Sequence, residues 1–215
     1  MILSTKPGNV TFDDLVRLTA ELDASRRVVV AIVGAPGSGK TTLAERLMSR
    51  LNEAAQFRAA LLPMDGYHYD DSILIERGLR ARKGAPETFD VFGLLHMLDR
   101  LKRNQEDEIA VPVFDRELEI SRAGARVISK TVQVLIVEGN YLLLDQHPWS
   151  RLRAMFDITV TVDVPEDLLR ERLVERWRGY GFSPAEIEAK VESNDLPNGR
   201  FVTSKSYPAD FVLRV

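Results

Sequence analysis

The pattern of apolar and polar positions divides the chain into short buried runs separated by helical patterns. Five apolar runs, several of them rich in β-branched residues, are predicted to be strands: residues 28–33, 59–64, 132–137, 158–164 and 211–215. Continuous apolar runs are typical of strands buried on both faces of a parallel sheet. Leucines recurring at helical spacing predict helices over residues 11–25, 41–54, 89–102 and 165–177. This alternation predicts an α/β fold with a mainly parallel sheet.

Two local signals add detail to this prediction. Thr11 is followed three residues later by Asp14, which is typical of a capping box at the start of a helix. Residues 109–114 and 125–128 are predicted to form a small hairpin outside the main sheet. No linker interrupts the pattern, so we expect one domain over residues 1–215.

Composition narrows the classes of function. The chain has 215 residues, a net charge of −3 and no cysteine. A mildly acidic chain has no general attraction for nucleic acid or anionic membranes, so any phosphate must be bound by a local site. The absence of cysteine excludes disulfides and thiolate catalysis. No apolar run is long enough for a membrane span, and residues 1–10 contain no signal-peptide core, so a cytoplasmic protein is expected.

The segment between the first predicted strand and the following helix carries the clearest chemistry. Residues 34–41 read G-A-P-G-S-G-K-T and fit the phosphate-loop motif G-x-x-x-x-G-K-[ST]. Its glycines allow backbone N–H groups to point at phosphate, and the helix that follows presents its positive end. We expect ATP to be bound by Gly34, Ala35, Pro36, Gly37, Ser38, Gly39, Lys40, Thr41 and Thr42. Lys40 would reach the β- and γ-phosphates, and the Thr41 hydroxyl would hold Mg²⁺.

Two acids follow predicted strands on the same edge of the sheet. Asp65 comes directly after the second apolar run, and Glu138 directly after the third. Ligands of open α/β sheets bind beyond the carboxyl ends of the strands, where these acids are expected. Phosphoryl transfer needs a group that aligns and deprotonates the acceptor, which we assign to Asp65. Glu138 is the candidate for holding Mg²⁺ through water.

Four further motifs follow the phosphate loop in order. They are M-D-G-Y-H-Y at residues 64–69, R-K-G-A-P-E-T-F-D at 82–90, P-V-F-D-R at 112–116 and V-E-G-N-Y at 137–141. Together with the phosphate loop, they resemble the uridine kinase, phosphoribulokinase and pantothenate kinase group of P-loop kinases. Within this group the chain is most similar to the proteins named fructose transport system kinases. The resemblance covers roughly residues 25–205.

The resemblance implies a five-stranded parallel core sheet with helices on both faces and a mobile lid. It implies that Asp65 is the base or substrate anchor and that Glu138 lies near the metal. The acceptor pocket would be shaped by the stretches around residues 83–90 and 114–116, which contain Lys83, Phe114, Asp115 and Arg116. His68, three residues after Asp65, is a further candidate for contacting the acceptor. The chain departs from the group at Arg116, where pantothenate kinases have histidine, and uridine kinases have a histidine a few residues beyond residue 112.

The stretch after the fourth predicted strand has the features of a lid. A helix beginning near Pro165 carries Arg172 and Arg176 on one face, since they are four residues apart. Arginine from a moving segment stabilises charge on a transferred phosphoryl group, and Gly179 and Gly181 would supply a hinge. A solvated helix face laced with ion pairs is the alternative. The lid is expected at about residues 166–195, and residues 194–198 are predicted to be a loop comparable to one near the adenine in related kinases.

These features favour an ATP-dependent kinase that phosphorylates a hydroxyl of a small metabolite, such as a sugar, a nucleoside or a vitamin-like compound. A regulatory NTPase acting with a protein partner is the first alternative. Guanine specificity is disfavoured because no asparagine is followed by lysine, as the motif N-K-x-D requires. A binding module without catalysis is the second alternative. The identity of the acceptor and the oligomeric state stay open.

Overall fold

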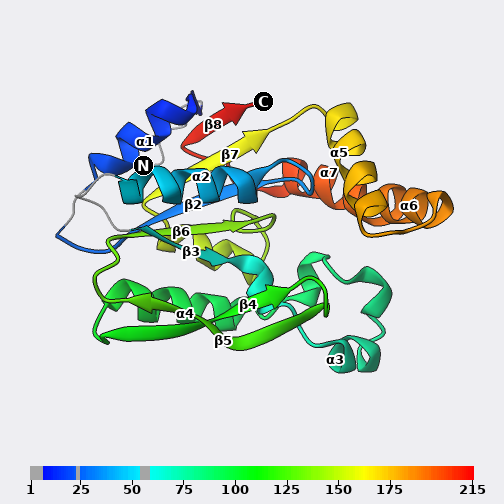
Figure 1. Cartoon of the computed structure of the whole chain (residues 1–215), viewed down its shortest axis with the longest axis horizontal. Coiled ribbons are helices and arrows are strands. Elements are labelled where there is room, and N and C mark those ends of the chain that lie inside the picture. Colours follow the sequence, from blue (N-terminus) through cyan, green and yellow to red (C-terminus); the bar gives the residue numbers. More distant parts are fainter. Residues whose placement is uncertain (1–6, 23–24, 54–58) are drawn as a thin grey trace.

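A parallel six-stranded sheet forms the centre of the computed structural model, which describes residues 7–22, 25–53 and 59–215 (Figure 1). The strands lie in the order β1-β8-β7-β2-β6-β3, and every neighbouring pair is parallel. Their bounds are β1 Gly8–Asn9, β2 Val28–Gly34, β3 Ala59–Pro63, β6 Val134–Gly139, β7 Ile158–Asp163 and β8 Phe211–Arg214. The α/β fold and the parallel sheet are therefore confirmed.

The sheet has one strand more than the five that were predicted. The additional strand, β1, is only two residues long and pairs with β8 at the edge of the sheet. Two exposed residues, Gly8 and Asn9, give no apolar run that could reveal a strand. The five predicted runs all form strands, with end points that differ by at most two residues.

The central strand β2 shows why both faces of the sheet must be covered. All seven of its residues are buried. Val28, Val30 and Ile32 pack into one core cluster, whereas Val29, Ala31 and Val33 pack into another. Successive side chains of a strand point to opposite faces, so this continuous apolar run supplies two cores at once.

Helices cover the two faces (Figure 1). Helices α1 (Phe12–Ala20) and α2 (Lys40–Glu53) pack on the face of Val28. The predicted capping box starts α1, because Thr11 and Asp14 exchange both of its hydrogen bonds. Helix α4 (Val91–Arg103) and the 3₁₀ turn Trp149–Met155 pack on the opposite face.

The predicted hairpin is confirmed and is longer than expected. Strands β4 (Glu108–Asp115) and β5 (Ile120–Ser129) are antiparallel, with an irregularity in the register between Val111 and Val113. The hairpin lies below the main sheet in Figure 1, beside α4. Buried hairpin residues Ile109, Val111 and Ile128 join the core on that side.

Short elements connect β3 to α4. A 3₁₀ turn, Met64–Tyr67, follows β3 directly and contains Asp65. Helix α3 (Asp71–Glu76) and the 3₁₀ turns Arg80–Arg82 and Pro86–Thr88 follow.

The last part of the chain before β8 is helical. Helices α5 (Glu166–Gly179) and α6 (Pro184–Lys190) lead through a π-helical segment, Val191–Asp195, into α7 (Leu196–Lys205). The prediction of a loop at residues 194–198 is therefore wrong. Its proline, Pro197, lies in the first turn of α7, where the missing N–H of proline is tolerated. Within the described ranges, every helix is too short or too polar to span a bilayer.

Candidate active site

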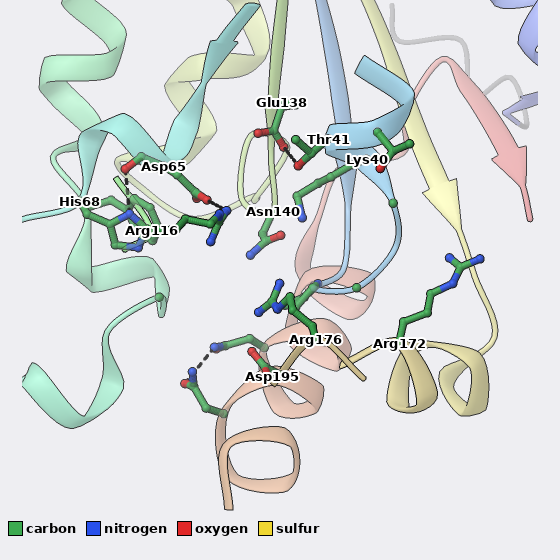
Figure 2. A pocket seen from close by; sticks show the side chains of 18 residues that line it. Lys40, Thr41, Asp65, His68, Arg116, Glu138, Asn140, Arg172, Arg176 and Asp195 are labelled. Carbon is green, nitrogen blue, oxygen red and sulfur yellow. Dashed lines mark hydrogen bonds and ion pairs between the residues drawn. The ribbon is translucent and has the colours of Figure 1, made fainter. Parts of the chain in front are cut away.

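A cavity of about 340 Å³ opens at the carboxyl ends of β2, β6 and β3 (Figure 2). Because β6 lies between β2 and β3, the ends of these three strands are neighbours in space although they are distant in sequence. The cavity is lined by the phosphate loop with the start of α2, the turn after β3, Gly84 and Phe89 before α4, and Arg116 at the start of the hairpin loop. The end of β6, the helices α5 and α7, and the π-helical segment between α6 and α7 complete the lining. The predicted residues that line it are Pro36, Gly37, Gly39, Lys40, Thr41, Thr42, Asp65, His68, Arg116, Glu138, Arg172 and Arg176.

The phosphate loop is a tight turn between β2 and α2. Gly37 and Gly39 have positive φ angles of 80° and 85°, which favour glycine. The Ser38 N–H donates to the Ala35 carbonyl at 3.1 Å and closes the turn. Gly34 has no room for a side chain, because a β-carbon there would lie 2.5 Å from the Ser38 Oγ. Helix α2 begins at Lys40, so its N-terminus and the loop N–H groups face the cavity together.

Thr41 and Glu138 connect the loop to β6. The Thr41 hydroxyl donates to the Glu138 Oε2 at 3.2 Å. Glu138 is only 4% exposed, and this burial raises the pKa of its carboxyl group, against the opposing charge of Lys40. Burial likewise lowers the pKa of Lys40, against the charges of Glu138 and Asp65. Both groups are poorly solvated, so bound ions of opposite charge would stabilise each of them.

Asp65 faces the phosphate loop from the far side of the cavity. Its Oδ2 accepts a hydrogen bond from Nη2 of Arg116 at 2.6 Å. Burial works to raise the pKa of Asp65, but His68, Arg116 and Lys40 together outweigh it and hold the pKa below its usual value. Asp65 is therefore a carboxylate near neutral pH.

His68 forms part of an aromatic wall beside Asp65. Its Nδ1 lies 2.8 Å from the Asp65 backbone carbonyl. The ring packs against Phe89 at 4.0 Å and Phe114 at 4.6 Å between centroids. Burial lowers the pKa of His68, which favours the neutral imidazole, with Nδ1 as donor to the carbonyl.

Three of the predicted acceptor residues do not line this cavity. The Lys83 ammonium, on a side chain only 8% exposed, pairs with Asp71 at 2.7 Å instead. The Asp115 carboxylate accepts from Arg122 and from two N–H groups of the following turn. The Phe114 ring packs against the ring of His68. These three side chains support the wall of the cavity, and local ion pairs account for the two charges.

The predicted lid arginines reach the cavity from α5. Nη1 of Arg172 donates to the Ser38 carbonyl at 3.3 Å, which joins the helix to the phosphate loop. The Arg176 guanidinium lies 4.9 Å above the Trp177 ring, and its buried Nε has no hydrogen-bond partner among the described residues. Arg170 and Arg178 lie away from the cavity, and Arg170 pairs with Glu192.

The structure adds polar residues that were not predicted as site residues. Asn140 follows β6, and its buried Oδ1 lacks a partner among the described residues. Asp195 accepts from Nε1 of Trp177 at 2.6 Å, and burial raises the pKa of its carboxyl group. Asn194 and Asn198 face each other one helical turn apart. Their cluster in the sequence was visible, but it was interpreted as a turn because of Pro197.

Comparison with known proteins identifies the family. The profile of a family described as AAA domain matches residues 30–188. The YggC protein of Escherichia coli (strain K12) is 34% identical over 90% of this chain and 80% of that protein. A Schizosaccharomyces pombe protein named "Putative uridine kinase C227.14" is 31% identical over 97% of this chain and 92% of its own length. This chain belongs to the uridine kinase-like P-loop kinases.

A solved structure supports the same assignment for this P-loop kinase. The crystal structure of a "putative fructose transport system kinase" from Silicibacter sp. TM1040 is 39% identical, with a TM-score of 0.88. The match covers 95% of this P-loop kinase and 99% of the other chain. The predicted resemblance is confirmed, and the chain is a member of a group of ATP-dependent small-molecule kinases.

Proposed function

We propose that this P-loop kinase transfers the γ-phosphoryl group of ATP to a hydroxyl of a small metabolite. The observation that carries this proposal is that the phosphate loop and the Asp65 carboxylate face one cavity from opposite sides. A phosphoryl donor and an acceptor hydroxyl must meet in line, and a carboxylate opposite the phosphate loop can align the hydroxyl.

The phosphate end of the cavity binds the nucleotide in this proposal. Loop N–H groups and the N-terminus of α2 hold the phosphates, and Lys40 adds a full positive charge. Because burial depresses the pKa of Lys40, bound phosphate would restore its preference for the charged form.

Mg²⁺ fits the oxygen donors at the end of β6. The Thr41 hydroxyl and the Glu138 carboxylate lie 3.2 Å apart, and hard oxygen ligands of this kind suit Mg²⁺, which also keeps several waters. Thr41 would hold the ion directly and Glu138 through water. When bound, Mg²⁺ neutralises charge on the phosphates.

Asp65 acts on the acceptor at the other end of the cavity. It accepts the hydroxyl proton as the hydroxyl oxygen bonds to the γ-phosphorus and the bond from that phosphorus to the β,γ-bridging oxygen breaks. ADP leaves with that electron pair, and Asp65 later releases the proton to solvent. Arg172 and Arg176 spread the charge of the transferred group, and closure of residues 166–195 excludes water from the reaction.

The test is ADP release with ATP and Mg²⁺ against sugars, nucleosides, vitamins, polyols and hydroxy acids. One acceptor should raise the rate well above the acceptor-free rate, and Asp65→Asn should lower it by about 10²-fold or more, as expected for loss of a general base. Asp99→Asn serves as the control, because Asp99 lies on α4 in an exposed ion pair with Arg103. Equal hydrolysis with every acceptor, unaffected by Asp65→Asn, would favour a regulatory NTPase instead.

A further inference from the structure

Arg116 places a positive charge at the acceptor end of the cavity. Its guanidinium makes one hydrogen bond with the described residues, from Nη2 to Asp65. An arginine has five N–H donors in a fixed planar fork, so most of them are left for a ligand. The side chain of Arg116 is 49% exposed and that of Asp65 is 24% exposed. Figure 2 shows the guanidinium next to the Asp65 carboxylate, on the side of the cavity away from the α5 arginines.

The hairpin holds this guanidinium in position. Arg116 follows the last residue of β4, and its guanidinium carbon lies 5.9 Å from the centre of the Phe114 ring. That ring is fixed in turn by packing on His68. Asp115 stabilises the turn by accepting from the N–H groups of Glu117 and Leu118, each at 3.1 Å. Half of the Arg116 side chain is exposed, and the ion pair with Asp65 and the hairpin turn together hold its guanidinium at the cavity.

The distribution of charge separates Arg116 from the other cations of the cavity. The charged side chains that line it are Lys40, Arg116, Arg172 and Arg176 against Asp65, Glu138 and Asp195. Lys40 belongs to the phosphate loop, and Arg172 contacts the loop at Ser38. Arg116 is the cation on the Asp65 side, among the described residues that line the cavity. A neutral acceptor would leave it paired only with the carboxylate that must receive the proton.

Building on the proposed function, we propose that the acceptor is a short hydroxy acid whose carboxylate binds Arg116 while its reacting hydroxyl faces Asp65. The planar fork of arginine matches the two oxygens of a carboxylate and can bind them with two parallel hydrogen bonds. An uncharged acceptor would offer no opposite charge to this fork.

The distance between the two side chains limits the acceptor further. Nη2 of Arg116 and Oδ2 of Asp65 are 2.6 Å apart. Arg116 would bind the acceptor carboxylate, and Asp65 the reacting hydroxyl, each over a hydrogen bond of about 2.7–2.9 Å. The carboxylate and the reacting hydroxyl must therefore lie close together, about one to three carbons apart. This spacing fits a carboxylate with a hydroxyl on a nearby carbon, as in a polyhydroxy acid.

The same arrangement links acceptor binding to proton transfer. Arg116 helps to hold the pKa of Asp65 low, which makes Asp65 a weak base before the acceptor binds. An acceptor carboxylate bound to the remaining donors of the guanidinium shares its positive charge, so the electrostatic effect of Arg116 on Asp65 weakens while their hydrogen bond stays in place. Asp65 then accepts the hydroxyl proton more readily, while the hydroxyl oxygen bonds to the γ-phosphorus and ADP departs. The correct acceptor would thus activate the base that it uses.

The first experiment compares matched acids and polyols. ADP release is measured with linear hydroxy acids of three to six carbons and with the uncharged polyol of the same carbon number. We expect an acid to stimulate ADP release at least 10-fold more than its polyol. A polyol, sugar or nucleoside that serves as well as every acid would overturn the hydroxy-acid proposal and leave the kinase function standing.

The second experiment tests Arg116 itself. Arg116→Gln should raise the KM for the acid by about 10- to 100-fold, as for loss of a charge-assisted hydrogen bond, with the KM for ATP unchanged. Arg116→Lys keeps the charge without the fork, so its KM for the acid should lie between the values of the wild type and of Arg116→Gln. Arg103→Gln is the control, since Arg103 forms an exposed ion pair with Asp99 on α4, away from the cavity. An unchanged KM in Arg116→Gln would refute the proposal.

Calorimetry separates this proposal from the kinase function. The best acid is titrated into the protein with Mg²⁺ and a non-hydrolysable ATP analogue. Binding to the wild type that is lost in Arg116→Gln supports the carboxylate site even if no phosphoryl transfer follows, in which case only the kinase function fails. Absence of binding by every acid overturns the proposed substrate class.

Discussion

Gly37 of the phosphate loop lies directly against Leu173 of α5. A β-carbon on Gly37 would come within 3.1 Å of the Leu173 Cγ. Leu173 is fully buried in a small core that also contains Ala35 of the loop and Ile187 of α6. The loop that is predicted to bind phosphate and the helix that carries Arg172 and Arg176 are therefore packed as neighbours.

This contact predicts that Gly37→Ala weakens ATP binding by about 10-fold or more. The substitution forces alanine into a left-handed conformation, at a cost of roughly 1–2 kcal/mol, and also crowds Leu173. Titration calorimetry with ATP and Mg²⁺ would measure the change. Gly124→Ala is the control, because Gly124 also has a positive φ but nothing lies within 4 Å of its β-carbon position. Equal affinities in the two variants would contradict the prediction.

The positions of the α5 arginines predict a difference within one helix. Arg172→Gln and Arg176→Gln should each lower kcat by about 10²-fold, the loss typical of one group that stabilises transition-state charge. Arg170→Gln should change kcat little, because Arg170 pairs with Glu192 outside the cavity. Steady-state kinetics with the best acceptor would check all three variants. A similar loss in Arg170→Gln would mean that α5 acts through its overall charge or stability.

A buried cation outside the active site predicts a pure stability effect. Arg27 is 3% exposed and donates to the backbone carbonyls of Val132, Leu101 and Ser129 at 2.8–2.9 Å. Arg27→Ala would remove all three of these hydrogen bonds, although the Ser129 carbonyl would keep one from the Val132 N–H at 3.0 Å. We therefore expect a loss of roughly 3 kcal/mol in the free energy of unfolding. Urea denaturation would measure it. Arg50→Ala, which breaks an exposed ion pair with Glu53, should cost less than about 0.5 kcal/mol.

Asp157, which is hydrogen-bonded to the start of β2, is expected to make a pH-dependent contribution to stability. Asp157 accepts from the Val29 N–H and from Arg26. Burial works to raise its pKa, but these hydrogen bonds outweigh it, so the pKa in the folded protein lies below the usual value. The unfolded chain binds the proton more readily. The stability from Asp157 is therefore complete above the unfolded pKa of about 3.9 and is lost as the pH falls through the lower folded value.

Asp157→Asn should thus lower the free energy of unfolding by about 1–3 kcal/mol at pH 7. The difference from the wild type should shrink as the pH falls below about 4. Urea denaturation across pH 3–7 would measure it. A difference that stays constant over this range would show that the charge of Asp157 contributes nothing.

The apolar runs predicted the sheet because burial on both faces leaves a signal in consecutive residues such as Val28 and Val29. The capping box at Thr11 was predictable because its hydrogen bonds join residues only three positions apart in the sequence. Strand β1 gave no signal, because two exposed residues form it only by pairing with β8. Residues 194–198 were misjudged because proline and asparagine are typical of turns, while the helix around them is stabilised by distant contacts.

The cavity brings together Lys40, Asp65, Arg116 and Glu138 from four separate parts of the chain. Motif spacing nominated Lys40, and strand-end position nominated Asp65 and Glu138, because parallel strands meet at one edge. Arg116 and Lys83 were expected only from the family resemblance, and Lys83 shows the limit of that reasoning. Its ammonium is held by Asp71 and by the backbone of Glu119, and no local pattern in the sequence reveals a pairing across 36 positions.

Because Trp177 donates a hydrogen bond to Asp195, its fluorescence can report on the helical region beside the phosphate loop. The chain has two tryptophans, and Trp149 is 3% exposed within the main core. Trp177 lies between Arg176 and the cavity-lining Asp195, in contact with Tyr180 and Phe182. Trp149 packs 5.7 Å from Phe89, which lines the cavity, so the variant Trp149→Phe separates the two signals. A change in emission on adding nucleotide or acceptor that persists in Trp149→Phe would originate at Trp177, so events at α5 can be followed without an attached dye.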